Sequence, residues 1–266
     1  MVSDRNRMIA SVAGTLQLVE VLGQAPGPLP LKAVAAATGR AKSTLHRMLS
    51  TLVSLGFVAQ DEVTGAYSLT MKLWRLGVAA VEGLDIFKLS RTHLEALMRA
   101  TDETVHVAVL DPSGDVIYIS KVESPRSIRV QTRIGQLSPS WCTATGRSML
   151  AFNSSVADRV LSQPLKPRTV KTVIDPKRIR AALSDAAAKG YAVTKSENHI
   201  EMGGIAAPIR DHTGGVIAAC GVAIPAFRMD RQLIDRCIPE VVRTAEAISA
   251  ELGYQQTKNR RLKYGT

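Results

Sequence analysis

The chain has few of the residues and spacings on which disulfides, metal sites and nucleotide cofactors depend. Its 266 residues include only three cysteines, Cys142, Cys220 and Cys237, which are far apart and odd in number. This usage is typical of a protein in a reducing compartment and argues against a disulfide framework. The chain contains no CxxC or HxxxH pair and no GxGxxG or P-loop arrangement. We therefore expect no metal and no cofactor.

Long apolar runs are also missing. The longest, residues 215–227, contains Pro225 and is too short to span a bilayer. The amino-terminal sequence MVSDRNRM has no apolar signal core. Both observations predict a soluble, cytoplasmic protein that does not associate with a membrane.

Charge is abundant and mostly of one sign. The formal net charge is +11 and the pI is about 9.9, which favours a polyanionic partner. Residues 1–70 carry six Lys and Arg against four Asp and Glu, so the excess there is only +2. Much of the remainder falls in residues 166–180 and in the tail, at Lys258, Arg260, Arg261 and Lys263. Arg5 and Arg7 lie on a polar arm that either contacts phosphate or is simply solvated.

Residues 31–56 have the pattern of a helix-turn-helix. A helix over 31–38 ends at Gly39, because glycine accepts the left-handed backbone that closes a helix. A second helix begins near Ala41 or Lys42, with Ser43 as a candidate cap. Helical spacing places its apolar residues on one buried face: Leu45, Met48, Leu49, Leu52 and Val53.

The opposite face of the second helix carries compact hydrogen-bond donors. Such donors, concentrated in the first two turns, are what a recognition helix offers to base edges and phosphates. The candidate DNA-binding residues are Arg40, Lys42, Ser43, Thr44, His46 and Arg47. An ordinary helical hairpin with a polar face is the alternative. Short strands predicted at 57–60 and 66–69, around a turn at 61–65, form the wing of a winged helix and favour the first interpretation.

Amphipathic helices flank this motif. One is predicted over residues 8–22 and turns six apolar residues towards the core: Ile9, Val12, Ala13, Leu16, Val19 and Val21. Another, MKLWRLGVAAVEGL at 71–84, is more apolar than a free linker requires. It either packs on its own domain or pairs with a second subunit, and pairing is the preferred interpretation.

A second domain is predicted from about residue 85 onwards. Helices are expected at 86–100, 143–152, 156–161, 176–189 and 231–252. Strands are expected at 104–110, 116–122, 128–134, 191–194, 205–210 and 216–223. This order predicts an α+β fold with an antiparallel-rich sheet and helices on its faces. The expected domains are a winged helix at 1–70, a linker helix at 71–85, an effector-binding domain at 86–253 and a basic tail at 254–266.

Several separated segments resemble the IclR family of bacterial transcription regulators. They are AKSTLHRMLSTLVSLGFV, ETVHVAVLD, PSWCTATGRSMLAF, KGYAV and GGIAAPIRD, in this order along the chain. The resemblance implies an amino-terminal winged helix, a linker helix and a GAF-like effector-binding domain. It also implies a homodimer or homotetramer that binds double-stranded promoter DNA and responds to a small organic acid.

The same resemblance implies an effector loop at 141–146 that leads into a helix. Thr143 is suited to cap that helix, and the first free backbone N–H groups form a carboxylate cradle. The implied effector-binding residues are Trp141, Cys142, Thr143, Ala144, Thr145, Gly146, Glu197, Met202, Cys220 and Val222. The chain departs from the family at Thr194, Gly204, Gly221 and Ala223, where relatives often carry polar or acidic groups. These departures indicate a larger or more apolar acid, of an aromatic or lactone type.

Two other functions compete with this one. Cys142 near a helix start is a candidate nucleophile, with His106, His199 or Glu197 as partners, but no spacing joins them into a triad, so we expect no enzyme. The other alternative is a winged helix used for protein contacts, with the second domain as a structural dimeriser.

Overall fold

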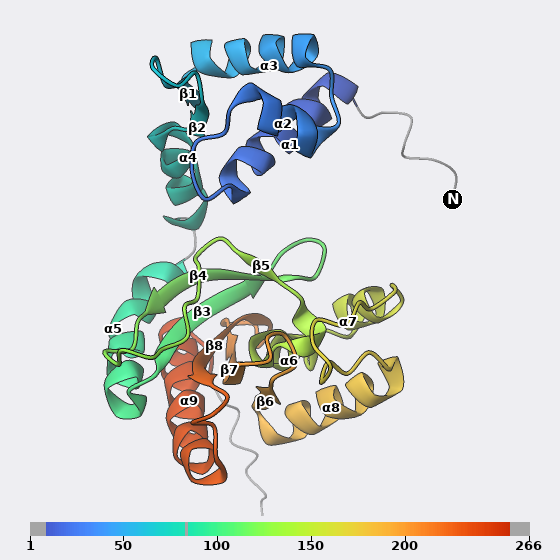
Figure 1. Cartoon of the computed structure of the whole chain (residues 1–266). Coiled ribbons are helices and arrows are strands. Elements are labelled where there is room, and N and C mark those ends of the chain that lie inside the picture. The colour runs from blue at the N-terminus through green and yellow to red at the C-terminus, as the bar shows by residue number, and fades with distance from the viewer. Residues whose placement is uncertain (1–8, 83–84, 256–266) are drawn as a thin grey trace, which may run out of the picture. The chain divides into compact units, whose positions relative to one another are not determined.

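The computed structural model describes residues 9–82 and 85–255, which form two compact units, Met1–Gly83 and Leu84–Thr266. Figure 1 shows both units. Arg5 and Arg7 of the predicted arm, and the basic residues of the tail, lie outside the described residues.

The first unit is a winged helix-turn-helix. Its elements are α1 (Ala10–Gln24), α2 (Leu31–Thr38), α3 (Lys42–Ser54), β1 (Val58–Gln60), β2 (Tyr67–Leu69) and α4 (Met71–Glu82). Gly39 closes α2 with a φ of +66°, which confirms the predicted turn. The strands β1 and β2 pair antiparallel and form the wing. Apolar side chains of the first three helices and the wing make one core, which includes Leu18, Leu22, Val34, Leu45 and Leu49.

Three local predictions for this unit were wrong. The buried face of α1 consists of Gly14, Leu18 and Leu22, while three residues predicted to be buried, Ile9, Val12 and Leu16, are 52 to 65% exposed. Ser43 does not cap α3, because the N-cap position is Ala41, which has no side-chain acceptor. Val53 is 37% exposed, so the buried face of α3 ends at Leu52.

The wing and the end of α3 hold the first turn of α4 in place. The Lys72 ammonium donates to the carbonyl of Leu55 at 2.7 Å and lies 4.5 Å from the centre of the Phe57 ring. A cation at the carboxyl end of a helix also complements the helix dipole. The hydroxyl of Thr70 donates to the carbonyl of Gly56 at 2.6 Å. These contacts tie the start of α4 to the winged helix.

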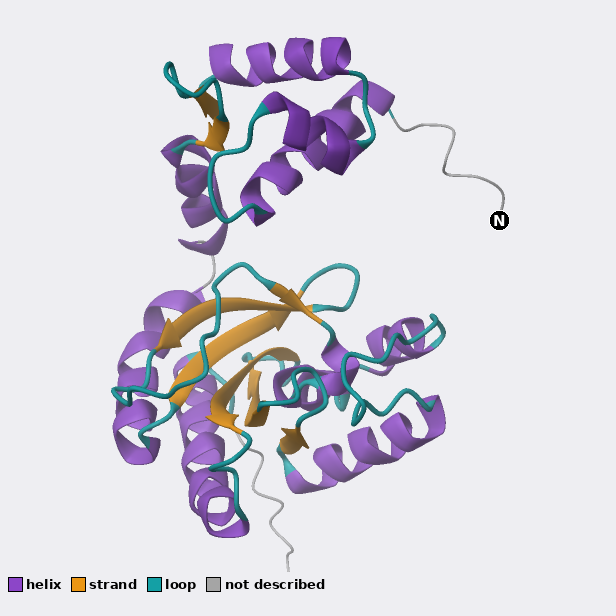
Figure 2. Cartoon of the chain, in the orientation of Figure 1, coloured by secondary structure: helices purple, strands orange, loops and turns teal. Residues whose placement is uncertain are grey.

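The second unit contains a six-stranded antiparallel sheet in the order β5-β4-β3-β8-β7-β6. The strands are β3 (Thr104–Leu110), β4 (Val116–Val122), β5 (Leu137–Ser138), β6 (Ala192–Lys195), β7 (Met202–Arg210) and β8 (Val216–Pro225). Helices α5 (Asp85–Thr101) and α9 (Arg231–Glu251) pack against one face. The short 3-10 helix η2 (Ser140–Cys142), α6 (Ala144–Leu150), α7 (Ser154–Leu161) and α8 (Pro176–Lys189) lie on the other side, as Figure 2 shows.

The strand predicted at 128–134 does not form. The third strand of this region is instead the two-residue β5, which pairs with Val116 and Ile117 of β4. Between β4 and β5 the chain is a long loop, whose backbone is held by hydrogen bonds to side chains rather than by pairing with another strand. The hydroxyl of Thr104 donates to the carbonyl of Val130 at 2.9 Å, and that of Ser124 donates to the carbonyl of Asp102 at 2.6 Å. The loop therefore crosses the end of β3 and brings Val130 and Thr132 over the sheet.

Candidate DNA-binding surface and effector pocket

The polar face of α3 is open to solvent. Leu45, Leu49 and Leu52 anchor the helix, while Lys42, Ser43, Thr44, His46 and Arg47 are exposed. A hollow of about 340 Å³ runs beside this face between α1 and α3, lined by Ser11, Thr15, Thr44, Arg47, Met48 and Thr51. Exposed donors on an anchored helix are the arrangement with which helix-turn-helix proteins contact a duplex groove. Arg40 is different, because its guanidinium turns back against α1.

Helix α4 exposes large apolar side chains. Met71, Trp74 and Leu76 are 68, 61 and 53% exposed. Met71 and Trp74 are one helical turn apart, so their exposed side chains can share a face of α4.

A small pocket of the second unit lies between the sheet and the start of α6. Its volume is about 60 Å³, well below the several hundred cubic ångströms usual for small-molecule sites. Five strands, the loop with Val130 and Thr132, and the loop at 196–201 contribute to its walls. The lining residues are His106, Tyr118, Val130, Thr132, Cys142, Thr143, Ala144, Thr145, Thr194, Asn198, His199, Met202, Gly203, Gly204, Val222 and Ala223.

His106 supplies a polar group without a partner to this pocket. Its Nε2 lies 2.9 Å from Oγ1 of Thr145, and its ring meets that of Tyr118 edge to face at 4.8 Å. Its Nδ1 is buried and has no hydrogen-bond partner among the described residues. Burial lowers the pKa of His106 from 6.5 to about 4, so the ring is neutral at physiological pH. A buried, unpartnered ring nitrogen in a pocket is a natural contact for a ligand's polar atom.

The start of α6 is arranged as the sequence predicts. Oγ1 of Thr143 accepts from the backbone N–H of Gly146 at 3.2 Å and caps the helix. The next two residues, Ala144 and Thr145, line the pocket. A Cβ on Gly146 would lie 2.3 Å from the Cα and carbonyl oxygen of Ser140, so only glycine lets η2 pack this close to α6.

A buried ion pair fixes the loop that covers the pocket. Nη1 and Nη2 of Arg147 donate to the two carboxylate oxygens of Glu197 at 2.8 and 2.6 Å. Nε of Arg147 donates to the carbonyl of Trp141 at 2.7 Å. Thr169 and Thr172 hold the same loop from outside, because their hydroxyls donate to the carbonyls of Ser196 and Glu197, each at 2.6 Å.

The chemistry of Cys142 does not suit a nucleophile. The residue is fully buried, and this burial, with the nearby Glu197 carboxylate, raises the pKa of its thiol to about 12. The cations of Arg147 and Arg168 offset that rise only in part. Because the thiolate is the reactive form, a raised pKa disfavours a nucleophilic role for Cys142 at neutral pH.

The structure brings six of the ten predicted effector residues to the pocket: Cys142, Thr143, Ala144, Thr145, Met202 and Val222. Three residues do not line the pocket, namely Trp141, Gly146 and Glu197. Their contacts instead hold η2, α6 and the loop at 196–201 in place. Cys220 belongs to the core on the α5–α9 face of the sheet.

Sequence reasoning missed His106, Tyr118, Thr132, Asn198 and His199 as pocket residues. A signal for His106 was present. Because Val105, Val107 and Val109 alternate on one face of β3, His106 must lie on the other face together with Thr104. Thr132 and Asn198 come from irregular loops, for which no such periodicity exists.

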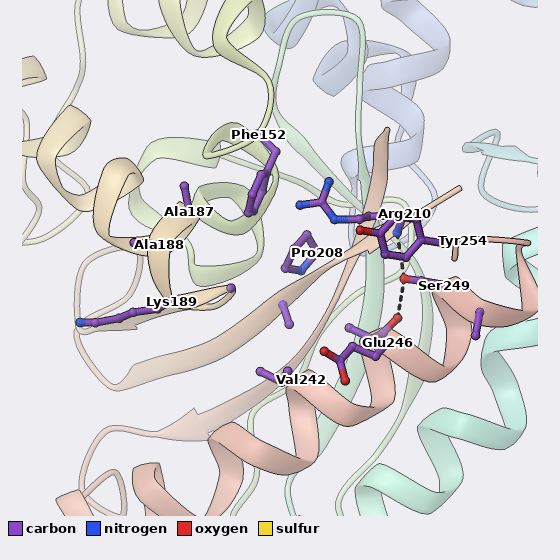
Figure 3. Close-up of a pocket in the computed structure, with 14 residues that line it drawn as sticks. Phe152, Ala187, Ala188, Lys189, Pro208, Arg210, Val242, Glu246, Ser249 and Tyr254 are labelled. Carbon is purple, nitrogen blue, oxygen red and sulfur yellow. Dashed lines mark hydrogen bonds between the residues drawn. The ribbon is translucent and has the colours of Figure 1, made fainter. Parts of the chain in front are cut away.

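A much larger hollow, of about 550 Å³, lies elsewhere in the same unit beside β7, as Figure 3 shows. It arises because β6 pairs only with residues up to Ala206, while β7 continues to Arg210. The free strand edge is protected: Pro208 has no N–H, and the N–H of Arg210 donates to Oγ of Ser249 at 2.9 Å. The Arg210 guanidinium lies over the Phe152 ring at 4.3 Å. We interpret the hollow as a capped sheet edge.

Neither a membrane-spanning helix nor a metal cluster is present among the described residues. Within residues 9–82 and 85–255, no helix is long and apolar enough to cross a membrane. The same residues contain no group of three or more His, Cys, Asp or Glu that could hold a metal ion.

Comparison with known proteins supplies the family. The model of the C-terminal domain of the bacterial transcriptional regulator IclR matches residues 78–250, and that of the IclR helix-turn-helix domain matches residues 11–62. The HTH-type transcriptional regulator KdgR of Escherichia coli is 31% identical over 215 residues, which are 80% of this chain and 81% of KdgR. The DNA-binding transcriptional repressor YiaJ of the same organism is 30% identical over 90% of this chain and 86% of its own length.

Solved structures agree. An IclR transcriptional regulator from Alicyclobacillus acidocaldarius superposes with a TM-score of 0.81 at 26% identity, over 92% of this chain and all of that one. An IclR homologue from Microbacterium hydrocarbonoxydans, crystallised with 4-hydroxybenzoate, gives 0.80 at 23% identity over 91 and 99% of the two chains. The relatives are named as transcriptional regulators rather than enzymes. The chain therefore belongs to the IclR family of DNA-binding transcriptional regulators, with a winged helix-turn-helix and a C-terminal effector-binding domain.

Proposed function

We propose that the protein binds promoter DNA as a homodimer and that a small organic carboxylate, bound in the pocket beside α6, modulates this binding. The observation that carries the DNA-binding half is the solvent-exposed polar face of α3, with Lys42, Thr44 and Arg47 on an apolar anchor. One recognition helix covers only a few base pairs, so useful specificity requires two half-sites held by a symmetric dimer.

The exposed apolar side chains of α4 support the dimer. We infer that Met71 and Trp74, which lie one helical turn apart, pack against the same helix of a second copy, because burying apolar side chains from water stabilises association. A two-fold contact of this kind needs no other partner. Further association of dimers into a tetramer is compatible with this arrangement.

Two features of the pocket support a carboxylate effector. The unpartnered Nδ1 of His106 provides one polar contact, and the first residues of α6 provide backbone N–H groups. The homologue crystallised with 4-hydroxybenzoate is consistent with an acid of the aromatic type. A ring of that size requires the loop at 196–201 to move, because the closed pocket holds only about 60 Å³.

Two experiments test the proposal. Binding of the full chain to the DNA upstream of its own gene, measured at two salt concentrations, separates a regulator from a protein-interaction module. Specific binding that weakens with salt is expected, and no binding at low salt favours the interaction module. For the effector, a thermal-shift series compares benzoate and 4-hydroxybenzoate with the corresponding uncharged amides. We expect the acids to stabilise the protein preferentially, and equal shifts for acids and amides contradict the carboxylate assignment.

A further inference from the structure

Gly14 occupies an unexpected place in α1. It lies in the middle of a 15-residue helix and is buried, although glycine in a helix interior costs about 1 kcal/mol relative to alanine. Its φ is not in the left-handed region, so the backbone itself does not require glycine. The reason must be sought in what lies against it.

The neighbour of Gly14 is the guanidinium of Arg40. A Cβ at position 14 would lie 2.6 Å from Cζ, 2.6 Å from Nη2 and 2.9 Å from Nη1 of Arg40. Three nearly equal distances to a planar group mean that the guanidinium lies face-on over the glycine. The backbone of α1 at Gly14 thus leaves a space that the guanidinium occupies and that any side chain at position 14 would fill.

All three atoms are the far end of a flexible side chain, and no backbone atom is involved. An alanine at position 14 would therefore be accommodated by moving the guanidinium, at little expense to the fold. Folding does not require glycine at position 14, whereas the observed placement of the Arg40 guanidinium does.

The charge of the Arg40 guanidinium that packs on Gly14 is not neutralised. No carboxylate of the described residues pairs with it, its Nε is buried without a hydrogen-bond partner, and its one contact, from Nη2 to Oε1 of Gln17, is long at 3.5 Å. Arg40 directly precedes Ala41, the N-cap of α3, which offers no side-chain acceptor to the helix. A fixed cation with free donors therefore stands next to the exposed first turn of the recognition helix.

We propose that Gly14 is a positioning residue for DNA binding: it seats Arg40 so that the guanidinium contacts a DNA phosphate beside the amino-terminal end of α3. The inference rests on the proposed function. Arginine suits this role, because its planar fork of donors matches a phosphate and keeps its charge at every relevant pH. Gly14 itself touches no DNA.

The test uses the full chain and the DNA upstream of its own gene. Binding is measured as a function of salt for the parent, Gly14→Ala, Arg40→Gln and the double variant. We expect Gly14→Ala to keep or raise the melting temperature and to weaken binding about tenfold, as the loss of a charge-assisted hydrogen bond does. The slope of log K against log salt should fall by about 0.9 for each half-site, one phosphate contact. The double variant should bind no more weakly than Arg40→Gln.

Gly27→Ala is the matched control, because a Cβ there meets nothing within 4 Å and the position lies in the loop after α1. It should keep the affinity and the salt slope of the parent. Three results overturn the inference while the proposed function stands. They are parental affinity and salt slope in Gly14→Ala, full additivity of the two effects in the double variant, and a lowered melting temperature for Gly14→Ala. A parent that binds no DNA at low salt overturns both.

Discussion

The buried ion pair between Arg147 and Glu197 permits a quantitative prediction. The two side chains are only 7 and 11% exposed, and each carboxylate oxygen accepts one guanidinium N–H. Replacing Arg147 by Met leaves the Glu197 carboxylate buried with one remaining donor, the N–H of Val173 at 3.4 Å. It also removes the donor to the carbonyl of Trp141. We expect a loss of about 3–5 kcal/mol in the free energy of unfolding.

Removing both charges should be far less harmful. A well-packed apolar pair often equals a buried ion pair in stability, so Arg147→Met with Glu197→Leu should lie within about 1–2 kcal/mol of the parent. The coupling energy of the cycle is then of the order of 3 kcal/mol. Two single variants whose losses simply add in the double variant would refute the role given to the pair.

The assay follows from the positions of the two tryptophans. Trp74 lies in the first unit and Trp141 in the second, next to the ion pair. In a Trp74→Phe background, urea unfolding followed by fluorescence reports the second unit alone. A change in midpoint at constant slope would give the stability difference directly.

Three further predictions concern single residues. Burial lowers the pKa of His106 from 6.5 to about 4, so the unfolded chain takes up this proton first as the pH falls, and the free energy of unfolding drops by roughly 3 kcal/mol between about pH 6.5 and 4. In urea titrations at several pH values, His106→Asn should lack this part of the pH dependence. An unchanged pH dependence would contradict the prediction. Gly190 closes α8 at a φ of +78°, and a Cβ added there would meet nothing within 4 Å. Gly190→Ala should therefore lower the free energy of unfolding by about 1 kcal/mol through backbone strain alone. The melting temperature should fall for Gly190→Ala and stay unchanged for Gly27→Ala. Trp74→Ser should shift a dimer towards monomer in sedimentation, and an unchanged dimer would place the interface elsewhere.

Much of the fold follows from local patterns in the sequence. Gly39 and Gly190 mark the ends of α2 and α8, because each adopts the left-handed backbone that glycine accepts. Alternation of Val105, Val107 and Val109 marks β3, and the turn at 111–115 places β4 directly after it; both strands have the predicted bounds. In both cases a physical requirement acts over a few neighbouring residues, so the sequence alone is sufficient.

The face of α1 shows where local patterns fail. The exposed stripe with Ile9, Val12 and Leu16 is more apolar than the buried one with Gly14, Leu18 and Leu22. Apolarity therefore selects the wrong face, and the buried glycine is explained only by Arg40, 26 positions along the chain.

The pocket was predictable only in part, for a similar reason. Residues near α6 are recognisable from the capped helix start, but Thr132 and Asn198 reach the pocket on loops. The loop at 196–201 is held by Arg147, Thr169 and Thr172, which come from distant segments. Long-range contacts of this kind leave no periodic trace in the sequence.

The central claim is that the exposed face of α3 binds a DNA groove, and Arg47→Ala tests it most directly. Binding to the DNA upstream of the protein's own gene is compared for the parent, Arg47→Ala and Arg91→Ala, whose side chain is an exposed cation of the second unit. We predict that Arg47→Ala loses about tenfold or more in affinity with an unchanged melting temperature, while Arg91→Ala binds like the parent. Parental affinity in Arg47→Ala would contradict the account.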